Sequence, residues 1–296
     1  MKVPIRLEEE IKNLIHSPTD LPDKFLRFQE FIVSGEGVIW DIPCIDKVVP
    51  PMKPGDVAVL LGRPSNGKTS LAGHFIRREA NRLVERGFTS HFKDEHGKRK
   101  CVVFISIELS VEQAESLWWA NDEMTTSELT RGGVSLNELR RIAPQRTLLP
   151  IWQIGQSVVD SKRNLPRMTV DNIYESVLWA QREYGIEPTL MALDYAQIVP
   201  VEKGMTRTDR VSEGIYQFKE LVRALRCPGI LCAQAGRSVD MREQQLPEIS
   251  DCQWSSAIEQ VADYVFGLWR PVTTHRGKGI NWMGKAKLEV TEEMFA

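Results

Sequence analysis

A phosphate-binding motif stands at residues 62–69, which read Gly-Arg-Pro-Ser-Asn-Gly-Lys-Thr and complete the pattern G-x-x-x-x-G-K-[ST]. Glycines in this pattern allow a tight turn in which successive backbone N–H groups point at one phosphate. Lys68 can then reach the β- and γ-phosphates of a nucleotide, and the Thr69 hydroxyl can bind Mg²⁺. We expect the nucleotide to contact Gly62, Arg63, Pro64, Ser65, Asn66, Gly67, Lys68, Thr69 and Ser70.

Three other polar side chains stand where a strand is expected to end. Glu108, Asp194 and Gln234 each come directly after a short apolar run. If these runs are parallel strands, their carboxyl ends meet at one edge of the sheet, where ligands bind. Each side chain alone has a simpler interpretation, as a strand-terminal polar group that meets solvent.

Beside a phosphate loop, these three side chains are the groups that nucleotide hydrolysis requires. We expect Asp194 to complete the Mg²⁺ shell opposite Thr69. Glu108 is placed to orient or deprotonate the attacking water, and Gln234 to hydrogen bond the γ-phosphate. With Lys68, they form the predicted catalytic set of this chain.

Alternating strand and helix patterns must position these groups. An apolar run precedes the phosphate loop and a helix-compatible run follows it, which is the strand–loop–helix context that the motif needs. Ser110 and Gln113 predict a capping box before a helix. The alternation predicts an α/β fold with a mainly parallel, twisted sheet covered by helices on both faces. Expected strands are 101–107, 149–154, 190–193, 229–233 and 264–269, and expected helices are 111–121, 136–142, 169–184 and 211–225.

Composition sets limits on the partners of this chain. The 296 residues carry a formal net charge of −2, so nucleic acid would have to bind at a local basic surface. The five cysteines are an odd number without a C-x-x-C pair, which favours a reducing, cytoplasmic compartment. No apolar run approaches the roughly 18 residues that cross a bilayer, so no membrane partner is expected.

In their order along the chain, these motifs resemble the ATPase domain of bacterial replicative helicases of the DnaB type, within the RecA-like phosphate-loop class. The similar stretches are the phosphate loop and residues 104–113, 194–198, 233–238 and 257–263. The resemblance implies a RecA-like ATPase domain at residues 36–296 that uses ATP and Mg²⁺. Residues 1–35 carry two short helical patterns without a core of their own, and we expect a linker that docks on its own domain or on a neighbouring subunit. The family's N-terminal primase-binding domain has no counterpart in this sequence.

The resemblance also implies a homo-oligomer, a hexameric ring with ATP sites at subunit interfaces. A basic residue of the neighbouring subunit then stabilises the transition state, as an arginine finger does. The nearest matches to the family's residues are Arg276 and Lys278, in swapped order, and the alternative is a basic surface hairpin. A primase or another replication protein is a further implied partner.

Single-stranded DNA is the substrate that the resemblance implies. Residues 201–210 are expected to form a loop, and residues 87–100 look like an insertion. One departure concerns a DNA-contacting Arg-Glu-Ser-Gly of the family, which here reads Gln-Trp-Ser-Ser at 253–256 and lacks the charge that would neutralise a phosphate. The tryptophan could stack on a base or pack in an interface. The candidate DNA contacts are Lys203, Arg207, Arg210, Arg237, Arg242 and Trp254.

Three functions are compatible with these residues. The first is an ATP-driven DNA helicase or translocase, moving 5′ to 3′ by resemblance. The alternative is a RecA-like DNA-binding ATPase, such as a recombinase, loader or regulator, without processive unwinding. A nucleotide-dependent switch that binds only protein is the third, and Glu108 argues against it because a pure switch has less need of a base at this position.

Overall fold

A computed structural model describes residues 17–34, 37–120, 124–159, 168–194, 207–242, 245–252 and 255–270. The chain divides into two compact units, Met1–Gly37 and Val38–Ala296. In the first unit, α2 (Leu21–Ser34) confirms the second predicted N-terminal helix. This helix exposes Leu21, Phe25 and Phe28. The first predicted N-terminal helical pattern lies outside the described residues.

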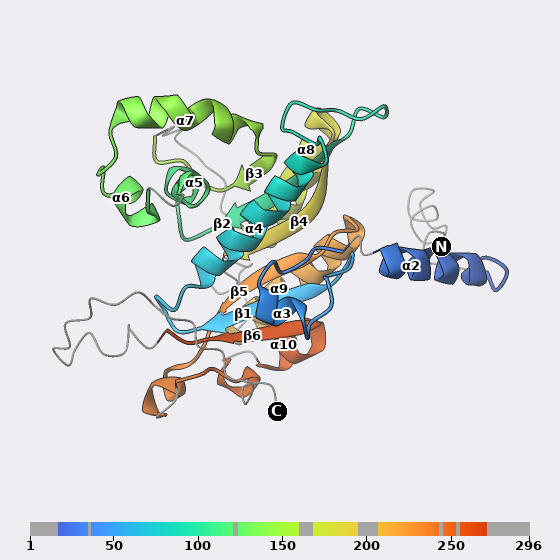
Figure 1. The fold of residues 1–296 in the computed structure, drawn as a ribbon. Coiled ribbons are helices and arrows are strands. Elements are labelled where there is room, and N and C mark those ends of the chain that lie inside the picture. The colour runs from blue at the N-terminus through green and yellow to red at the C-terminus, as the bar shows by residue number, and fades with distance from the viewer. Residues whose placement is uncertain are drawn as a thin grey trace, which may run out of the picture. The chain divides into compact units, whose positions relative to one another are not determined.

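The second unit is built on a sheet of six parallel strands in the order β3-β2-β4-β5-β1-β6 (Figure 1). Every residue of β1 is buried, as expected for a strand covered on both faces. The predicted parallel sheet is therefore confirmed. The strands are β1 (Val57–Gly62), β2 (Arg99–Ser106), β3 (Ile151–Ile154), β4 (Ile186–Asp194), β5 (Gly229–Gln234) and β6 (Tyr264–Leu268).

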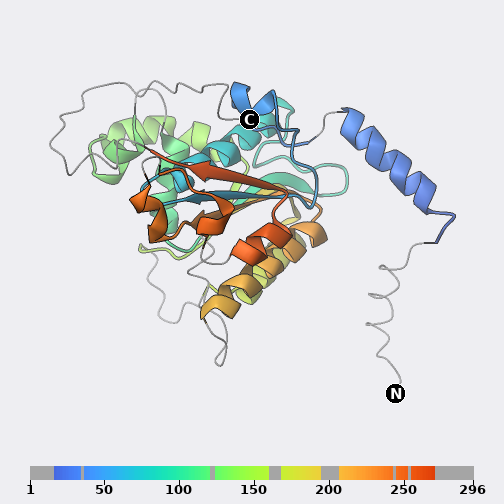
Figure 2. The same cartoon turned by 90° about the horizontal axis from the view of Figure 1, so that it is seen from below.

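Helices cover both faces of this sheet, and the two views of the ribbon show them on opposite sides (Figure 1, Figure 2). Alternate residues of β1 divide between two hydrophobic cores, one packed against α8, α9 and α10 and the other against α4 and α5. The helices are α3 (Pro43–Asp46), α4 (Lys68–Glu85), α5 (Val111–Trp119), α6 (Thr126–Thr130), α7 (Leu136–Leu148), α8 (Val170–Tyr184), α9 (Arg207–Ala224) and α10 (Ser255–Val261), with 3₁₀ turns η2 (Arg237–Met241) and η3 (Ile249–Asp251).

Two helix boundaries differ from the sequence-based prediction by more than two residues. The α9 helix begins at Arg207 rather than at residue 211, so the predicted loop at 201–210 overlaps its first turn. Polar residues with adequate helix propensity open this helix, and polarity alone had indicated a loop. The α7 helix runs to Leu148, beyond Pro144 and the predicted end at residue 142. No described helix is both long and apolar enough to cross a bilayer.

Candidate active site

The carboxyl ends of five adjacent strands, β2, β4, β5, β1 and β6, meet around one cavity of about 560 Å³. Strand pairing aligns Ser106 with Asp194 and Gly62 with Gln234, so the residues that follow these strands lie side by side. Among the residues predicted for the site, those that line this cavity are Pro64, Ser65, Gly67, Lys68, Thr69, Ser70, Glu108, Asp194 and Gln234. The structure thus brings the phosphate loop together with all three predicted strand-end groups.

The phosphate loop owes its shape to its glycines and to the neighbouring strand β6. Gly67 caps α4 with φ of 90°, in the left-handed region that favours glycine. At Gly62 a Cβ atom would lie 3.1 Å from the carbonyl oxygen of Leu268, so only glycine fits there without displacing β6. The side-chain amide of Asn66 donates to the same Leu268 oxygen at 3.2 Å. The end of β6 therefore supports the loop from the side.

Lys68 is folded back onto the loop that carries it. Its Nζ donates to the carbonyl oxygens of Gly62 at 2.9 Å and Arg63 at 3.1 Å. Burial lowers the pKa of Lys68, and the nearby Asp194 and Glu108 act in the opposite direction. A partly dehydrated ammonium group at this position gains more from an anionic phosphate than a solvated one would.

Thr69 and Asp194 form a direct contact across the cavity. The Thr69 hydroxyl donates to Oδ2 of Asp194 at 2.7 Å, and only 1% of the Asp194 surface is exposed. Burial raises the pKa of Asp194, while the hydrogen bond from Thr69 lowers it. A hydroxyl and a carboxylate are hard oxygen donors of the kind that Mg²⁺ binds, usually through one or two carboxylates together with phosphates and water. Within the described ranges, no group of three or more His, Cys, Asp or Glu side chains is placed to hold a metal ion by itself.

Local hydrogen bonds on both sides fix the position of Glu108. The Ser106 hydroxyl accepts from the Leu109 amide at 3.0 Å and donates to the Leu109 carbonyl at 2.9 Å. The predicted capping box is confirmed, because the Ser110 hydroxyl accepts from the Gln113 amide and the Gln113 side chain accepts from the Ser110 amide. Glu108 thus lies between a strand end and a helix start that are both held in place.

Several residues that line the cavity were not predicted. Arg270 follows β6, so the strand-end argument that found Glu108 could have found it as well. The α5 residues lie on one side of a helix whose start was predicted. The α6 helix was not predicted, although Thr125 and Glu128 form the capping-box pattern that could have indicated its start. The unpredicted lining residues are Leu109, Gln113, Ser116, Leu117, Thr126, Thr130 and Arg270.

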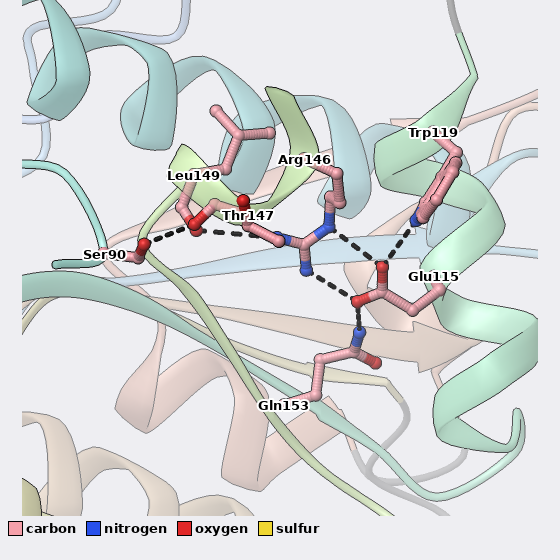
Figure 3. Close-up of polar contacts among 7 residues, drawn as sticks. All are labelled: Ser90, Glu115, Trp119, Arg146, Thr147, Leu149 and Gln153. Carbon is pink, nitrogen blue, oxygen red and sulfur yellow. Dashed lines mark hydrogen bonds and ion pairs between the residues drawn. The ribbon is translucent and has the colours of Figure 1, made fainter. Parts of the chain in front are cut away.

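The side of α5 away from the cavity is held by the carboxylate of Glu115 (Figure 3). It accepts from Nε and an NH₂ nitrogen of Arg146 at 2.9 and 2.6 Å, from Nε1 of Trp119 at 2.8 Å, and from the Gln153 amide. Arg146 belongs to α7 and Gln153 to β3. One side chain therefore connects the cavity wall to the outer helix and the edge strand.

Arg63 does not point into the cavity in the manner of its neighbours. Its guanidinium donates to both carboxylate oxygens of Asp240 at 2.9 and 2.8 Å, and to the Ala235 carbonyl at 3.0 Å.

Among the predicted DNA contacts, Arg237 is exposed in η2, and Arg242 is paired with Asp251. Lys203, Trp254, Arg276 and Lys278, and the side chains of Arg207 and Arg210, lie outside the described residues, so their roles remain predictions.

Residues 37–292 match the family model of the DnaB-like helicase C terminal domain. The chain belongs to this family. Among its curated relatives in the DnaB family is the replicative DNA helicase DnaB of Rickettsia bellii, 26% identical over 216 residues, which are 73% of this chain and 41% of the relative. The protein of the same name from Geobacillus stearothermophilus is 25% identical over 249 residues, or 81% of this chain and 50% of the relative. The chain spans about half or less of the length of these relatives.

Two solved structures share the fold. One of them, an ATPase domain, superposes with a TM-score of 0.67 at 19% identity, covering 88% of this chain and 86% of that one. The other, a DnaB-like replicative helicase solved in a study of its interactions with primase, gives a TM-score of 0.62 at 19% identity and covers 85% of this chain and 56% of that one. The predicted RecA-like architecture of the DnaB type is thereby confirmed.

Proposed function

We propose that this chain is the ATP-hydrolysing motor of a DnaB-type helicase that moves on single-stranded DNA. The observation that carries the proposal is the contact between Thr69 and the buried Asp194 beside Lys68, with Glu108 and Gln234 on the same cavity. Nucleotide hydrolysis requires these groups, whereas a site that only binds nucleotide does not require Glu108.

Each side chain has a distinct role in this proposal. Lys68 binds the β- and γ-phosphates, and Gln234 hydrogen bonds the γ-phosphate. Glu108 accepts a proton from the attacking water or orients it. Thr69 and Asp194 would hold Mg²⁺, which when bound would neutralise charge on the phosphates.

The proposed assembly is a hexameric ring in the cytoplasm with ATP at subunit interfaces. Residues 36–296 form the ATPase domain and residues 1–35 the linker that docks on its own domain or on another subunit. Arg276 or Lys278 of one subunit reaches the γ-phosphate bound by its neighbour. A primase is a candidate partner, since a structural neighbour was solved in a study of its interactions with primase.

A RecA-like DNA-binding ATPase without processive unwinding is the second candidate. The replacement of a charged residue by glutamine at 253, relative to the family pattern, favours it. So does the pairing of Arg242 with Asp251, which leaves this guanidinium less able to bind a DNA phosphate.

A strand-displacement assay with ATP, Mg²⁺ and forked DNA distinguishes these functions. We expect unwinding by the wild type, and none by Glu108→Gln at equal protein concentration. ATP turnover that single-stranded DNA stimulates, without unwinding of either fork polarity, would support the second candidate instead. Absence of ATP turnover by the assembled wild type would contradict both.

A further inference from the structure

An ion pair joins the phosphate loop to the segment after Gln234, which we call the sensor segment (residues 235–242). Arg63 binds both oxygens of Asp240 and the Ala235 carbonyl, and Arg63 and Asp240 are 177 positions apart in the sequence. The planar fork of a guanidinium fixes the orientation of a carboxylate as well as its distance. A displacement of the Arg63 backbone larger than its side chain can absorb therefore moves Asp240 or breaks these bonds.

A second ion pair joins the sensor segment to residues 245–252. Two guanidinium nitrogens of Arg242 each bind an oxygen of Asp251 at 2.8 Å, and Asp251 is buried. The Asp251 side chain also accepts from the Glu248 amide at 2.8 Å, and its carbonyl accepts from the Gly236 amide at 2.7 Å. The sensor segment is thus bound to the phosphate loop through Ala235 and Asp240, and to residues 245–252 through Gly236, Asp240 and Arg242.

Residues 245–252 lie close against the sheet. A Cβ atom on Gly267 of β6 would lie 2.5 Å from the Pro247 carbonyl oxygen, and Ala235 pairs with Cys252 in a β-bridge. Both ribbon views show the orange segment that follows β5 alongside β6 (Figure 1, Figure 2). In the sequence, Cys252 directly precedes residues 253–254, where a DNA contact is predicted.

We propose that Asp240 is a positioning residue that transmits the state of the phosphate loop to residues 245–252. Arg63 connects it to the loop, and the Arg242–Asp251 pair connects the sensor segment onward. The Asp240 side chain is 44% exposed and that of Arg63 18%, so their ion pair contributes modestly to folding stability as well as to coupling. The consequence for DNA rests on the proposed function, whereas the mechanical connection does not.

Hydrogen exchange tests the connection without DNA. Amide exchange in residues 245–252 is compared with and without a non-hydrolysable ATP analogue, in the full chain. We expect the analogue to change exchange rates roughly fivefold or more in the wild type and in Asp240→Glu, and not in Asp240→Asn. Glu220→Gln is the matched control, because Glu220 forms an exposed ion pair with Arg223 on α9. An equal response in Asp240→Asn, with analogue bound, overturns the proposal.

The DNA consequence is measured as the stimulation of ATP turnover by single-stranded DNA. Asp240→Asn should keep the turnover of the wild type without DNA and lose roughly fivefold or more of the stimulation. Asp240→Glu should retain the stimulation, as should Glu220→Gln. A direct contact between residue 240 and DNA predicts the opposite sign, since removal of a negative charge would strengthen DNA binding. Full stimulation in Asp240→Asn contradicts the coupling.

Arg242 offers a separate check, because DNA contact was predicted for it. If Arg242 positions residues 245–252, Arg242→Gln leaves the salt dependence of DNA binding unchanged. A decrease of about 1 in the salt slope shows direct phosphate contact and overturns this role for Arg242. If wild-type exchange responds to nucleotide but DNA does not stimulate turnover, the proposed function fails while the connection through Asp240 stands.

Discussion

The hydroxyl of Thr69 and the carboxylate of Asp194 are in hydrogen-bond contact at 2.7 Å, although 125 positions separate them in the sequence. Thr69 lies in the first turn of α4 and Asp194 ends β4, so the parallel sheet brings a helix start and a strand end together. The carboxylate is buried where water cannot fully solvate it, and burial raises its pKa. A charge held in this way serves cation binding at a cost in stability.

Replacement of Asp194 by asparagine should therefore stabilise the protein in the absence of nucleotide and Mg²⁺. The amide keeps the side-chain volume and an acceptor for Thr69, but carries no charge to desolvate. We expect a gain of roughly 0.5–2 kcal/mol in the free energy of unfolding at pH 7, measured with denaturant. ATP turnover should fall to background. Lower stability than the wild type would show that the charge is well compensated in the folded state.

The raised pKa of Asp194 should also make the free energy of unfolding depend on pH. The folded-state pKa of Asp194 lies above its ordinary value of 3.8, so the folded state binds more protons than the unfolded state between these two values. Stability contributed by this group is therefore present below pH 3.8 and decreases as pH rises through the folded-state pKa. The stability difference between Asp194→Asn and the wild type should grow over that window and then remain constant. A constant difference at all pH values would contradict the assigned cause.

Glu108 is expected to act on the attacking water rather than on nucleotide binding. Glu108→Gln should reduce ATP turnover by roughly 10²- to 10⁴-fold, the typical contribution of a general base. The affinity for an ATP analogue should change little, because Lys68 and the loop remain. Glu95→Gln, in the exposed loop before β2, is the matched control and should behave as the wild type. Near-normal turnover in Glu108→Gln would remove Glu108 from this role.

Local sequence signals predicted the parts of this site that local structure determines. The phosphate loop and the capping box of α5 involve residues a few positions apart, and the strand ends required only that apolar runs be recognised. The pairing of Arg63 with Asp240 could not be predicted, because no local pattern specifies which carboxylate a guanidinium finds across the fold. The start of α9 was misjudged because polar residues occur both in loops and in the first turns of helices.

Replacement of Glu115 should lower both the free energy of unfolding and the affinity for nucleotide. Glu115→Ala leaves Arg146, whose side chain is only 13% exposed, without its carboxylate partner. We expect a loss of roughly 1.5–3 kcal/mol in the free energy of unfolding. The other side of α5 lines the cavity, so KM for ATP should rise more than kcat falls. Glu138→Gln breaks an exposed ion pair with Arg141 on α7 and should cost less than about 1 kcal/mol.

A substitution at Gly267 tests how closely residues 245–252 pack against β6. A Cβ atom there would lie 2.5 Å from the Pro247 carbonyl oxygen, a backbone atom that cannot rotate away. Gly267→Ala should therefore cost roughly 1–3 kcal/mol of folding stability through overpacking. Gly133→Ala is the control, because its Cβ would meet backbone at an ordinary 3.4 Å, and it should stay within about 0.5 kcal/mol of the wild type. Equal stability of the two variants, measured by denaturant unfolding, would show that residues 245–252 can move away from β6 without loss.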